Sequence, residues 1–382
     1  MKSICAVEGV SAAGIKEGKF GLSLIRASGT AAAVFTRDLV KAAPVELMME
    51  RIRRGELDAV IANSGCANCY TGKRGYEDAI RMCEIAGDSM GLDPECIGVA
   101  STGVIGRYLD LPLIERQAKT IAPRIERTES AEDLAAAAIM TTDTLPKHAL
   151  VEREGFSVGG IAKGSGMIAP NMGTMLAFVY TDAEIEYSVL HEALRMAARR
   201  TFNRVVVDEA STNDVLFCTA TELRGPVDEG EFSLALTEVC RQLAVQIAAD
   251  GEGATKLLEV RVRGAPTEEG AADVARSIVA SPLVKSAVYG EDPNWGRVVA
   301  AAGRAGVEFE PDAISLWIGE GDEKTPLVVN GEIAADLTKA KAAMRGKHVI
   351  FEMELSAGEG EATAWGCDLT EGYVHINGRY TT

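Results

Sequence analysis

Short apolar runs alternate with amphipathic helical segments along the whole chain, and this alternation constrains the fold more than any other feature. Residues 30–38 and 57–65 have the composition of strands, and the second run ends in turn residues. Residues 75–91 place apolar side chains at helical spacing and stop at a glycine. The pattern continues with a strand expected at 284–289 and β-rich material to the end of the chain. Such alternation predicts an α/β protein.

The chain is long enough for more than one domain. Its 382 residues correspond to two or three domains of ordinary size. The segment Ala265–Gly270 is the best candidate for a linker, because it joins two regular regions with turn-forming and charged residues. We therefore expect a larger domain over residues 1–267 and a smaller α/β domain over residues 268–382.

Charge and hydropathy exclude two classes of partner. The net charge is −17, and the densest basic cluster, Arg51 to Arg54, is followed at once by acidic residues. A nucleic-acid backbone would be repelled by such a surface. No stretch reaches the roughly 18 apolar residues of a membrane span, and the N-terminus has no apolar signal region. The eight cysteines are scattered, as in a reducing compartment, so we predict a cytoplasmic protein that binds neither nucleic acid nor membrane.

Two short motifs are similar to ligand sites but lack the rest of such sites. Cys66 and Cys69 form a C-x-x-C pair, yet the chain has no second pair and its four histidines lie far apart in sequence. Residues 164–169 fit a loose G-x-G-x-x-A pattern, but Pro170 follows where a phosphate-binding helix would have to continue. We therefore expect no metal and no cofactor.

The pair Gly173–Thr174 stands between a glycine-rich turn and an apolar run. A threonine hydroxyl is a poor nucleophile unless a base lies beside it. Cleavage of the chain before Thr174 would free an α-amine with a pKa of about 8, which can serve as the base for its own residue. Gly173 permits the backbone geometry that an N→O acyl shift needs. The alternative is that the pair only begins a core strand.

Other segments supply groups that would suit such a nucleophile. Thr102 and Gly103 end an expected strand with a hydroxyl and a backbone N–H that could face an oxyanion, or they form only a turn. Thr141 lies in a run of threonines around Asp143, where local side-chain-to-backbone bonds are the usual role. Glu252 lies between two glycines, where its carboxylate meets either a substrate amine or solvent.

Taken together, these segments resemble one known family along essentially the whole chain. The chain is similar to the glutamate/ornithine N-acetyltransferase family of arginine biosynthesis (the ArgJ type), through the motifs KGSGMIAPNMGTMLAF, STGVIG, MTTDT, STND, DGEGATK, GEDPNWGR and YVHINGRYTT. The resemblance implies an αββα sandwich of the DmpA/ornithine acetyltransferase type, built around an N-terminal threonine nucleophile, with a second, smaller C-terminal α/β domain.

The resemblance also implies a reaction. The chain would cleave itself between Gly173 and Thr174 into an α chain of residues 1–173 and a β chain of residues 174–382, which pair into an α2β2 assembly. Thr174 would take acetyl from N²-acetyl-L-ornithine and pass it to L-glutamate by a ping-pong mechanism, without a cofactor. Three departures from the family pattern stand out: Gly173 replaces alanine, Cys66 replaces an asparagine, and the loop over residues 207–214 is shortened.

Site roles are carried over residue by residue. Thr102 and Gly103 correspond to the oxyanion hole. Lys163 is a cation that would lower the pKa of the threonine amine by like-charge repulsion. The residues expected to line the amino-acid site are Thr141, Lys163, Thr174, Glu252, Asn377 and Thr382.

Three alternatives stay open at this point. A bifunctional form would also use acetyl-CoA to acetylate glutamate. An N-terminal-nucleophile aminopeptidase or amidase would hydrolyse its acyl intermediate with water. A non-catalytic amino-acid-binding protein would leave its chain uncut.

Overall fold

The computed structural model describes residues 1–169, 175–208 and 212–379, and it divides the chain into two compact units. Unit 1 comprises Met1–Asn203 and Ala210–Leu243, and unit 2 comprises Arg204–Glu209 and Ala244–Thr381. The candidate linker Ala265–Gly270 lies inside unit 2, where it joins a strand to a helix. The domain limits expected from the sequence, with their boundary at residue 267, stay a prediction.

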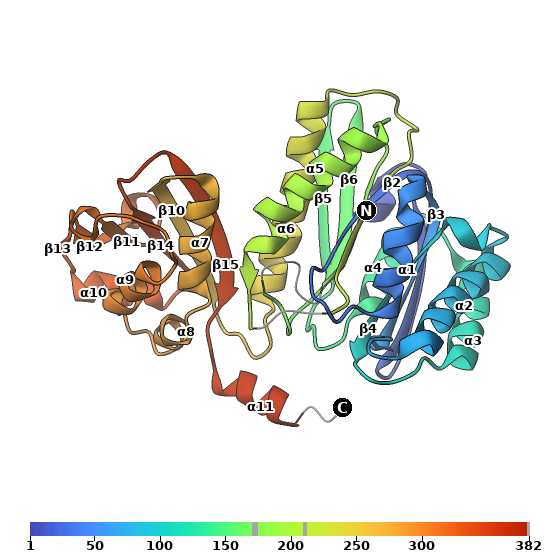
Figure 1. Cartoon of the computed structure of the whole chain (residues 1–382), viewed down its shortest axis with the longest axis horizontal. Helices are drawn as coiled ribbons and strands as arrows, with labels where there is room; N and C mark the ends of the chain where they lie inside the picture. The colour runs from blue at the N-terminus through green and yellow to red at the C-terminus, as the bar shows by residue number, and fades with distance from the viewer. Residues whose placement is uncertain (170–174, 209–211, 380–382) are drawn as a thin grey trace. The chain divides into compact units, whose positions relative to one another are not determined.

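Unit 1 combines one continuous sheet with flanking helices (Figure 1). Its strands are β1 (Ser11–Glu17), β2 (Phe20–Phe35), β3 (Glu56–Cys66), β4 (Ile97–Val104), β5 (Lys147–Arg153), β6 (Phe156–Lys163), β7 (Leu176–Thr181) and β9 (Val215–Ala220). Its helices are α1 (Ala43–Arg51), α2 (Gly72–Met90), α3 (Leu111–Ile121), α4 (Glu129–Ile139), α5 (Tyr187–Arg200) and α6 (Glu229–Ala249), whose last residues belong to unit 2.

Strand β2 belongs to two layers at once. Its first half pairs with β1 and β3, and its second half, from Thr30 onward, pairs with β9. The register shifts between Arg26 and Gly29, where the strand changes partners. The hydrogen-bonded path therefore runs β4-β3-β2-β9-β7-β6-β5. Strand β2 is thus the element that joins the β1-β3-β4 side of the sheet to the β5-β6-β7-β9 side.

The sheet folds over on itself at this shared strand. Neighbouring strands lie about 4.8 Å apart, so β4 and β6, five steps apart along the path, would be well separated in a flat sheet. Instead Lys163 of β6 contacts Thr102 of β4 at 3.2 Å. Side chains from both halves, among them Leu24, Ile61 and Phe178, share one hydrophobic core. The predicted α/β class with a two-layer arrangement of strands is confirmed.

Helices cover the outer faces of these strands. Helices α5 and α6 lie on one side of unit 1, and α2 and α3 lie on the other (Figure 1). Helix α4 packs against β1, β2 and β3, where Gly14 and Gly21 allow the helix backbone to approach closely. Helix α2 ends at Gly91, which adopts the left-handed conformation with φ 68°, as the sequence predicts.

Unit 2 contains a second sheet, in the order β13-β12-β11-β14-β10-β15-β8. The strands are β8 (Val205–Val206), β10 (Leu257–Ala265), β11 (Ser315–Ile318), β12 (Thr325–Val329), β13 (Glu332–Ile333), β14 (His348–Glu354) and β15 (Gly360–Cys367). The helices are α7 (Glu268–Val279), α8 (Pro282–Tyr289), α9 (Trp295–Gly303), α10 (Leu337–Met344) and α11 (Glu371–Arg379). Helix α7 packs on β10 and β15.

Two predictions for this part of the chain are wrong. Residues 284–289 form part of helix α8 instead of a strand, because Ser281 caps the helix at Val284 N–H and Pro282 occupies the first turn. The last described element is helix α11, where the sequence predicts β structure. In α11 the half-buried Tyr373 and Ile376 are three residues apart, while Val374 between them is exposed.

Among the described residues, no helix combines the length and the apolar composition that crossing a bilayer requires.

Candidate functional site

Strands β4 and β6 bring two of the predicted site residues into contact. Lys163 is the last residue of β6, and its Nζ donates a hydrogen bond to Thr102 Oγ1 at 3.2 Å. Lys163 is 2% exposed and Thr102 is fully buried. A buried ammonium is costly unless anions or hydrogen-bond acceptors surround it, so this contact is a specific feature of the fold. It places a positive charge beside a hydroxyl near the end of a strand.

The backbone after Thr102 depends on glycine. Gly103 has φ 130°, and a Cβ there would lie 2.4 Å from the backbone of Gly65 on the neighbouring strand β3. The two glycines are paired in register at the ends of β3 and β4. An L side chain at Gly103 would be strained by its φ and would collide with β3. The close approach that places this backbone beside Thr102 therefore requires glycine.

A buried carboxylate organises the charges around Lys163. Asp143 Oδ1 accepts hydrogen bonds from Lys147 Nζ at 2.7 Å and from Gly164 N–H at 2.6 Å, and Asp143 Oδ2 accepts one from Thr141 N–H at 3.0 Å. Burial alone would raise the pKa of Asp143, but the charges of Lys163 and Lys147, with hydrogen bonds from Lys147 and Gly164, outweigh it and lower the pKa to about 2. Asp143 is thus ionised at neutral pH.

The predicted role of Asp143 in local hydrogen bonds is therefore only part of its role. It bonds the backbone of Thr141, as expected for a threonine-rich turn, and it also balances two buried lysines. The next hydroxyl, Thr142 Oγ1, lies 2.7 Å from Ser165 Oγ in the glycine-rich turn. Asp143 thus holds the backbone of Thr141. Asp143 and Thr142 together hold the glycine-rich turn that follows Lys163.

A third lysine, Lys16, approaches the strand ends from β1. Lys16 Nζ donates to Ser64 Oγ at 2.8 Å and to the carbonyl of Met140. Desolvation lowers its pKa to about 8; Asp143 opposes this shift and the positive charge of Lys163 adds to it. The sequence analysis did not select Lys16, and nothing in its local pattern distinguishes it from a surface lysine.

Gly173, Thr174 and Thr382 lie outside the described residues. Met175, the first described residue after Thr174, is buried, and its N–H donates to Asp214 Oδ1 at 2.6 Å. Asp214 and its neighbour Asn213 were also missed by the sequence analysis. Only the STND motif pointed to their segment.

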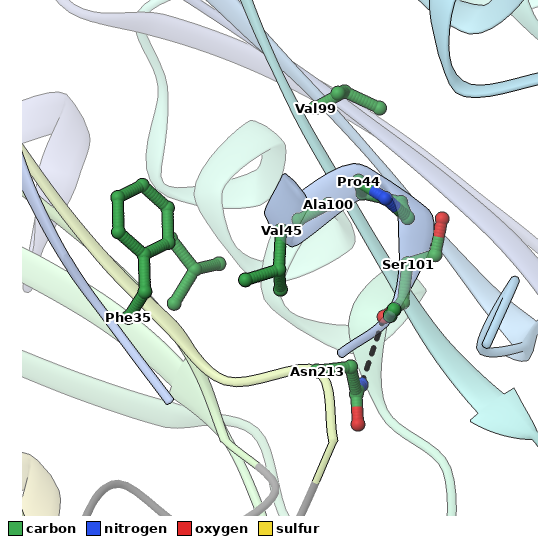
Figure 2. Close-up of a pocket in the computed structure, with 9 residues that line it drawn as sticks. Phe35, Pro44, Val45, Val99, Ala100, Ser101 and Asn213 are labelled. Atoms are coloured by element: carbon green, nitrogen blue, oxygen red, sulfur yellow. Dashed lines mark hydrogen bonds between the residues drawn. The ribbon is translucent and has the colours of Figure 1, made fainter. Parts of the chain in front are cut away.

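A narrow gap, too small for a water molecule, lies beside β4 at Val99, Ala100 and Ser101 (Figure 2). Its walls are mostly apolar and include Phe35, Pro44 and Val45. At one end, Asn213 Nδ2 donates to the carbonyl of Ser101 at 2.8 Å, which is the bond drawn in Figure 2. Apolar packing and the hydrogen bond from Asn213 thus hold this part of β4 in place.

Two further predicted residues meet in unit 2. Asn377 Nδ2, on helix α11, donates to Glu252 Oε2 at 2.7 Å. The turn that carries Glu252 is fixed by Gly253, which has φ 70° and whose Cβ would lie 2.4 Å from Tyr373 N–H of α11. Thr370 Oγ1 also donates to the carbonyl of Gly253 at 2.7 Å. The start of α11 therefore packs on this turn, and Glu252 and Asn377 form a polar pair that is accessible to solvent.

The two groups of residues suit different chemical tasks. The group in unit 1, namely Thr102, Gly103, Thr141 and Lys163, offers a polarised hydroxyl, a glycine backbone and a buried cation, which together can stabilise a developing negative charge. The pair in unit 2 offers a carboxylate and an amide, which recognise an ammonium and polar groups. The sequence-predicted residues that the structure describes thus form two clusters.

Comparisons with known proteins find similar sequences along nearly the whole chain. A sequence model described as the ArgJ family matches residues 7–382. A glutamate N-acetyltransferase from Methanosarcina mazei is 51% identical over 99% of this chain and 98% of its own length. The arginine biosynthesis bifunctional protein ArgJ from Symbiobacterium thermophilum is 47% identical over 96% of this chain and 93% of its own length.

A solved structure is also similar. A crystal structure of the arginine biosynthesis bifunctional protein ArgJ from Bacillus halodurans is 40% identical, with a TM-score of 0.50. The similarity covers 96% of that chain and 52% of this one.

Proposed function

This chain belongs to the ArgJ family, and we propose that it transfers the acetyl group of N²-acetyl-L-ornithine to L-glutamate, releasing L-ornithine and N-acetyl-L-glutamate. It is an acyltransferase of arginine biosynthesis, as its relatives are. The observation that carries the proposed mechanism is the contact between the buried Lys163 ammonium and the buried Thr102 hydroxyl.

The direction of that hydrogen bond assigns a role to Thr102. A lysine ammonium can only donate, so Thr102 Oγ1 is the acceptor and keeps its own proton. The hydroxyl can then donate this proton to another oxygen, and the ammonium polarises it. Thr102 and the N–H of Gly103 form the oxyanion hole in this proposal. Removal of one such donor typically lowers kcat by 10²- to 10³-fold, which makes the assignment testable.

The proposed maturation step produces the nucleophile. Thr174 Oγ attacks the carbonyl carbon of Gly173, an ester forms, and the amide C–N bond between the two residues breaks. Water then hydrolyses the ester, which leaves a carboxylate on Gly173 and a free α-amine on Thr174. The products are an α chain of residues 1–173 and a β chain of residues 174–382, which stay together in an α2β2 assembly.

Acetyl transfer then proceeds in two halves. Thr174 Oγ attacks the acetyl carbonyl while the α-amine of the same residue takes its proton, and the tetrahedral oxyanion is held by Thr102 and Gly103. The amide C–N bond breaks, and ornithine leaves with that proton on its amine. The amine of glutamate then attacks the acetyl ester, its proton passes to the Thr174 oxygen, and N-acetylglutamate leaves. Lys163 keeps the threonine amine unprotonated by like-charge repulsion.

The remaining predicted residues bind the amino-acid substrates in this proposal. Glu252 holds the ammonium of the bound amino acid, and Asn377 orients the Glu252 carboxylate through the 2.7 Å bond. Thr141 and Thr382 also contact the substrates in this proposal. The reaction as proposed needs only groups of this chain and its two substrates.

Two further parts of the proposal concern the protein as a whole. The Bacillus halodurans chain is matched over 96% of its length yet covers 52% of this chain, which supports a family organisation in two chains. The free cysteines of this chain support a reducing compartment, and we place the enzyme in the cytoplasm.

Intact-mass analysis of the parent and of Thr174→Ala tests the proposal. We expect two fragments meeting at Gly173 and Thr174 in the parent, and one uncut chain in the variant. The parent should also move labelled acetyl from N-acetylornithine to glutamate. An uncut parent that lacks exchange would overturn the proposal.

The relatives named bifunctional make acetyl-CoA the second donor to examine. Acetylation of glutamate by acetyl-CoA without N-acetylornithine would identify that form. Release of free acetate in the absence of glutamate would instead indicate a hydrolase.

A further inference from the structure

Two adjacent buried side chains before strand β9 reach two different strands of unit 1. Asn213 is 4% exposed, and its Nδ2 donates to the carbonyl of Ser101 on β4 at 2.8 Å (Figure 2). Asp214 is fully buried, and its Oδ1 accepts from Met175 N–H, directly before β7, at 2.6 Å. One short segment thus holds β4 and the start of β7 at the same time.

Both contacts are made to peptide groups that adjoin proposed reacting residues. The N–H of Met175 belongs to the peptide bond that joins Thr174 to Met175. The carbonyl of Ser101 belongs to the peptide bond that joins Ser101 to Thr102. Because a peptide group is planar, a hydrogen bond to its N–H or C=O also restricts the neighbouring Cα. Asn213 and Asp214 therefore each restrain a peptide group next to a residue that the proposed reaction uses.

The segment that carries this pair is itself held in place. Val215 N–H donates to the carbonyl of Met175 at 3.2 Å, and β7 and β9 then continue in parallel from Leu176 and Val215. On the other side, Thr36 N–H donates to the carbonyl of Asp214 at 3.2 Å. A hydrogen bond to a carboxylate is about twice as strong as a neutral one, so Asp214 adds to the ladder a contact that sheet pairing alone does not provide.

We propose that Asn213 and Asp214 are positioning residues that set the spacing between Thr174 and the oxyanion-stabilising groups of Thr102 and Gly103. This inference rests on the proposed function, because it needs Thr174 as the nucleophile. Asn213 fixes the strand with the oxyanion donors, and Asp214 fixes the strand that follows the nucleophile. Since Asn213 and Asp214 are consecutive residues, one peptide unit links the two contacts and so sets the spacing between Thr174 and the oxyanion-stabilising groups. A displacement of about 1 Å in such geometry can cost about 100-fold in rate.

The other end of β7 offers a matched control. Asp182 follows β7 directly, is 1% exposed, and accepts hydrogen bonds from Ser157 N–H at 2.7 Å and from Glu8 N–H at 3.1 Å. It is therefore a second buried aspartate that holds backbone N–H groups at the same strand, but at the end away from Met175. Substitution of Asp182, which also loses an ion pair with Arg224 Nε at 3.8 Å, measures what the loss of structural contacts away from Met175 costs.

The experiment compares Asp214→Ala and Asp214→Asn with Asp182→Ala and Asp182→Asn in the full chain. Self-cleavage is followed by intact mass over time, and acetyl transfer is measured as kcat and KM per cleaved chain, with thermal unfolding of each variant as the measure of folding. We expect Asp214→Ala to slow cleavage and to lower kcat by about 10- to 100-fold at nearly unchanged KM. Asp214→Asn keeps an acceptor oxygen and should lie between Asp214→Ala and the parent.

The control variants decide between positioning and stability. Asp182→Ala and Asp182→Asn should lower the unfolding temperature while kcat per cleaved chain stays within about twofold of the parent. Asn213→Ala, which loses the bond to Ser101, should lower kcat at unchanged KM as Asp214→Ala does. Equal kcat losses in the Asp214 and Asp182 variants would overturn the inference.

Failure of the proposed function is a separate result. If the parent itself is not cut and transfers no acetyl group, the proposed function is wrong. If the parent is cut and active while Asp214→Asn and Asn213→Ala retain its kcat, only the positioning role is wrong. If the Asp214→Ala chain fails to fold, Asp214→Asn and Asn213→Ala still decide the question.

Discussion

The two clusters of candidate site residues differ sharply in their surroundings. In unit 1, Thr102 and Lys163 are buried beside a buried carboxylate, and each is held by a neighbouring strand or turn. In unit 2, Glu252 is half-buried and Asn377 is exposed, and they rest on a turn and a short terminal helix. The first cluster therefore lies in a low dielectric with fixed geometry, whereas the second lies in contact with water.

This difference suggests a division of tasks. Stabilisation of a transition state benefits from desolvated, preorganised groups, because they need no rearrangement when charge develops. Recognition of an entering amino acid needs accessible groups that can exchange water for the substrate. We therefore expect substitutions in unit 1 to act on kcat and on stability, and those in unit 2 to act on KM.

The largest effect is expected at Thr102. Thr102→Val keeps the shape of the side chain but removes the hydroxyl that Lys163 polarises. We expect kcat to fall by about 10²- to 10³-fold with little change in KM, because only the developing oxyanion loses a donor. Steady-state kinetics on the cleaved enzyme check this. An unchanged kcat would show that Thr102 is not part of the oxyanion hole, and the contrast between the two clusters would lose its main support.

The next effect concerns stability and lies at Asp143. Asp143→Asn leaves Lys147 and Lys163 without their shared buried counter-charge, so we expect the free energy of unfolding to fall by about 3 kcal/mol. Urea unfolding monitors the loss. The double variant Asp143→Asn/Lys147→Met removes the unpaired charge as well and should recover part of it. A loss below about 1 kcal/mol would mean that this cluster is hydrated after all.

The same carboxylate predicts an acid dependence. Its pKa is lowered to about 2 in the folded chain from an ordinary value of 3.8, so the unfolded chain binds the proton more readily. The stabilisation is complete above about pH 4, declines as pH falls toward 2, and amounts to about 2 kcal/mol. Unfolding free energies of the parent and of Asp143→Asn should therefore converge between pH 4 and pH 2. Parallel curves across that window would contradict the assignment.

A smaller effect, on KM, is expected for Glu252. Glu252→Gln keeps the acceptor oxygen for Asn377 but loses the charge that would hold a substrate ammonium. We expect KM for N-acetylornithine and glutamate to rise by about 10- to 30-fold, in line with the loss of one charge-assisted hydrogen bond. The rate of self-cleavage should not change. A fall in kcat at constant KM would instead show that Glu252 acts on the transition state, as we expect of the unit 1 cluster.

The sequence predicts individual elements better than the way they join. The helix that ends at Gly91 follows from local spacing and a glycine with positive φ, which are readable along the chain. Strand β2 was seen only in its second half, because its partners β3 and β9 lie on either side of a register shift that no local pattern encodes. The valines of residues 284–289 are typical of a strand, but the cap at Ser281 and Pro282 begin a helix there.

The site shows the same limit. Thr102 and Lys163 were selected separately, and only the folding of the sheet reveals that they touch. Asp143 and Lys147 are four residues apart, but their contact forms in a turn, where helical spacing rules do not apply. The sequence does not reveal Asp214, because its partner, Met175, lies directly before another strand and 39 residues away in the chain. Non-local contacts of this kind decide which polar residues become catalytic or positioning groups.

The smallest effect is expected at Asn377, and it sharpens the comparison most. Asn377 is exposed, and its proposed role is to orient the Glu252 carboxylate. Because solvent can replace an exposed hydrogen bond, Asn377→Ala should raise KM by only about two- to fivefold and leave kcat and the unfolding temperature unchanged. Asn377→Asp, which places a like charge beside Glu252, should raise KM further, and added salt should reduce that increase through screening. A loss in kcat as large as that of Thr102→Val would show that this pair is desolvated during turnover, and the contrast between the two clusters would no longer hold.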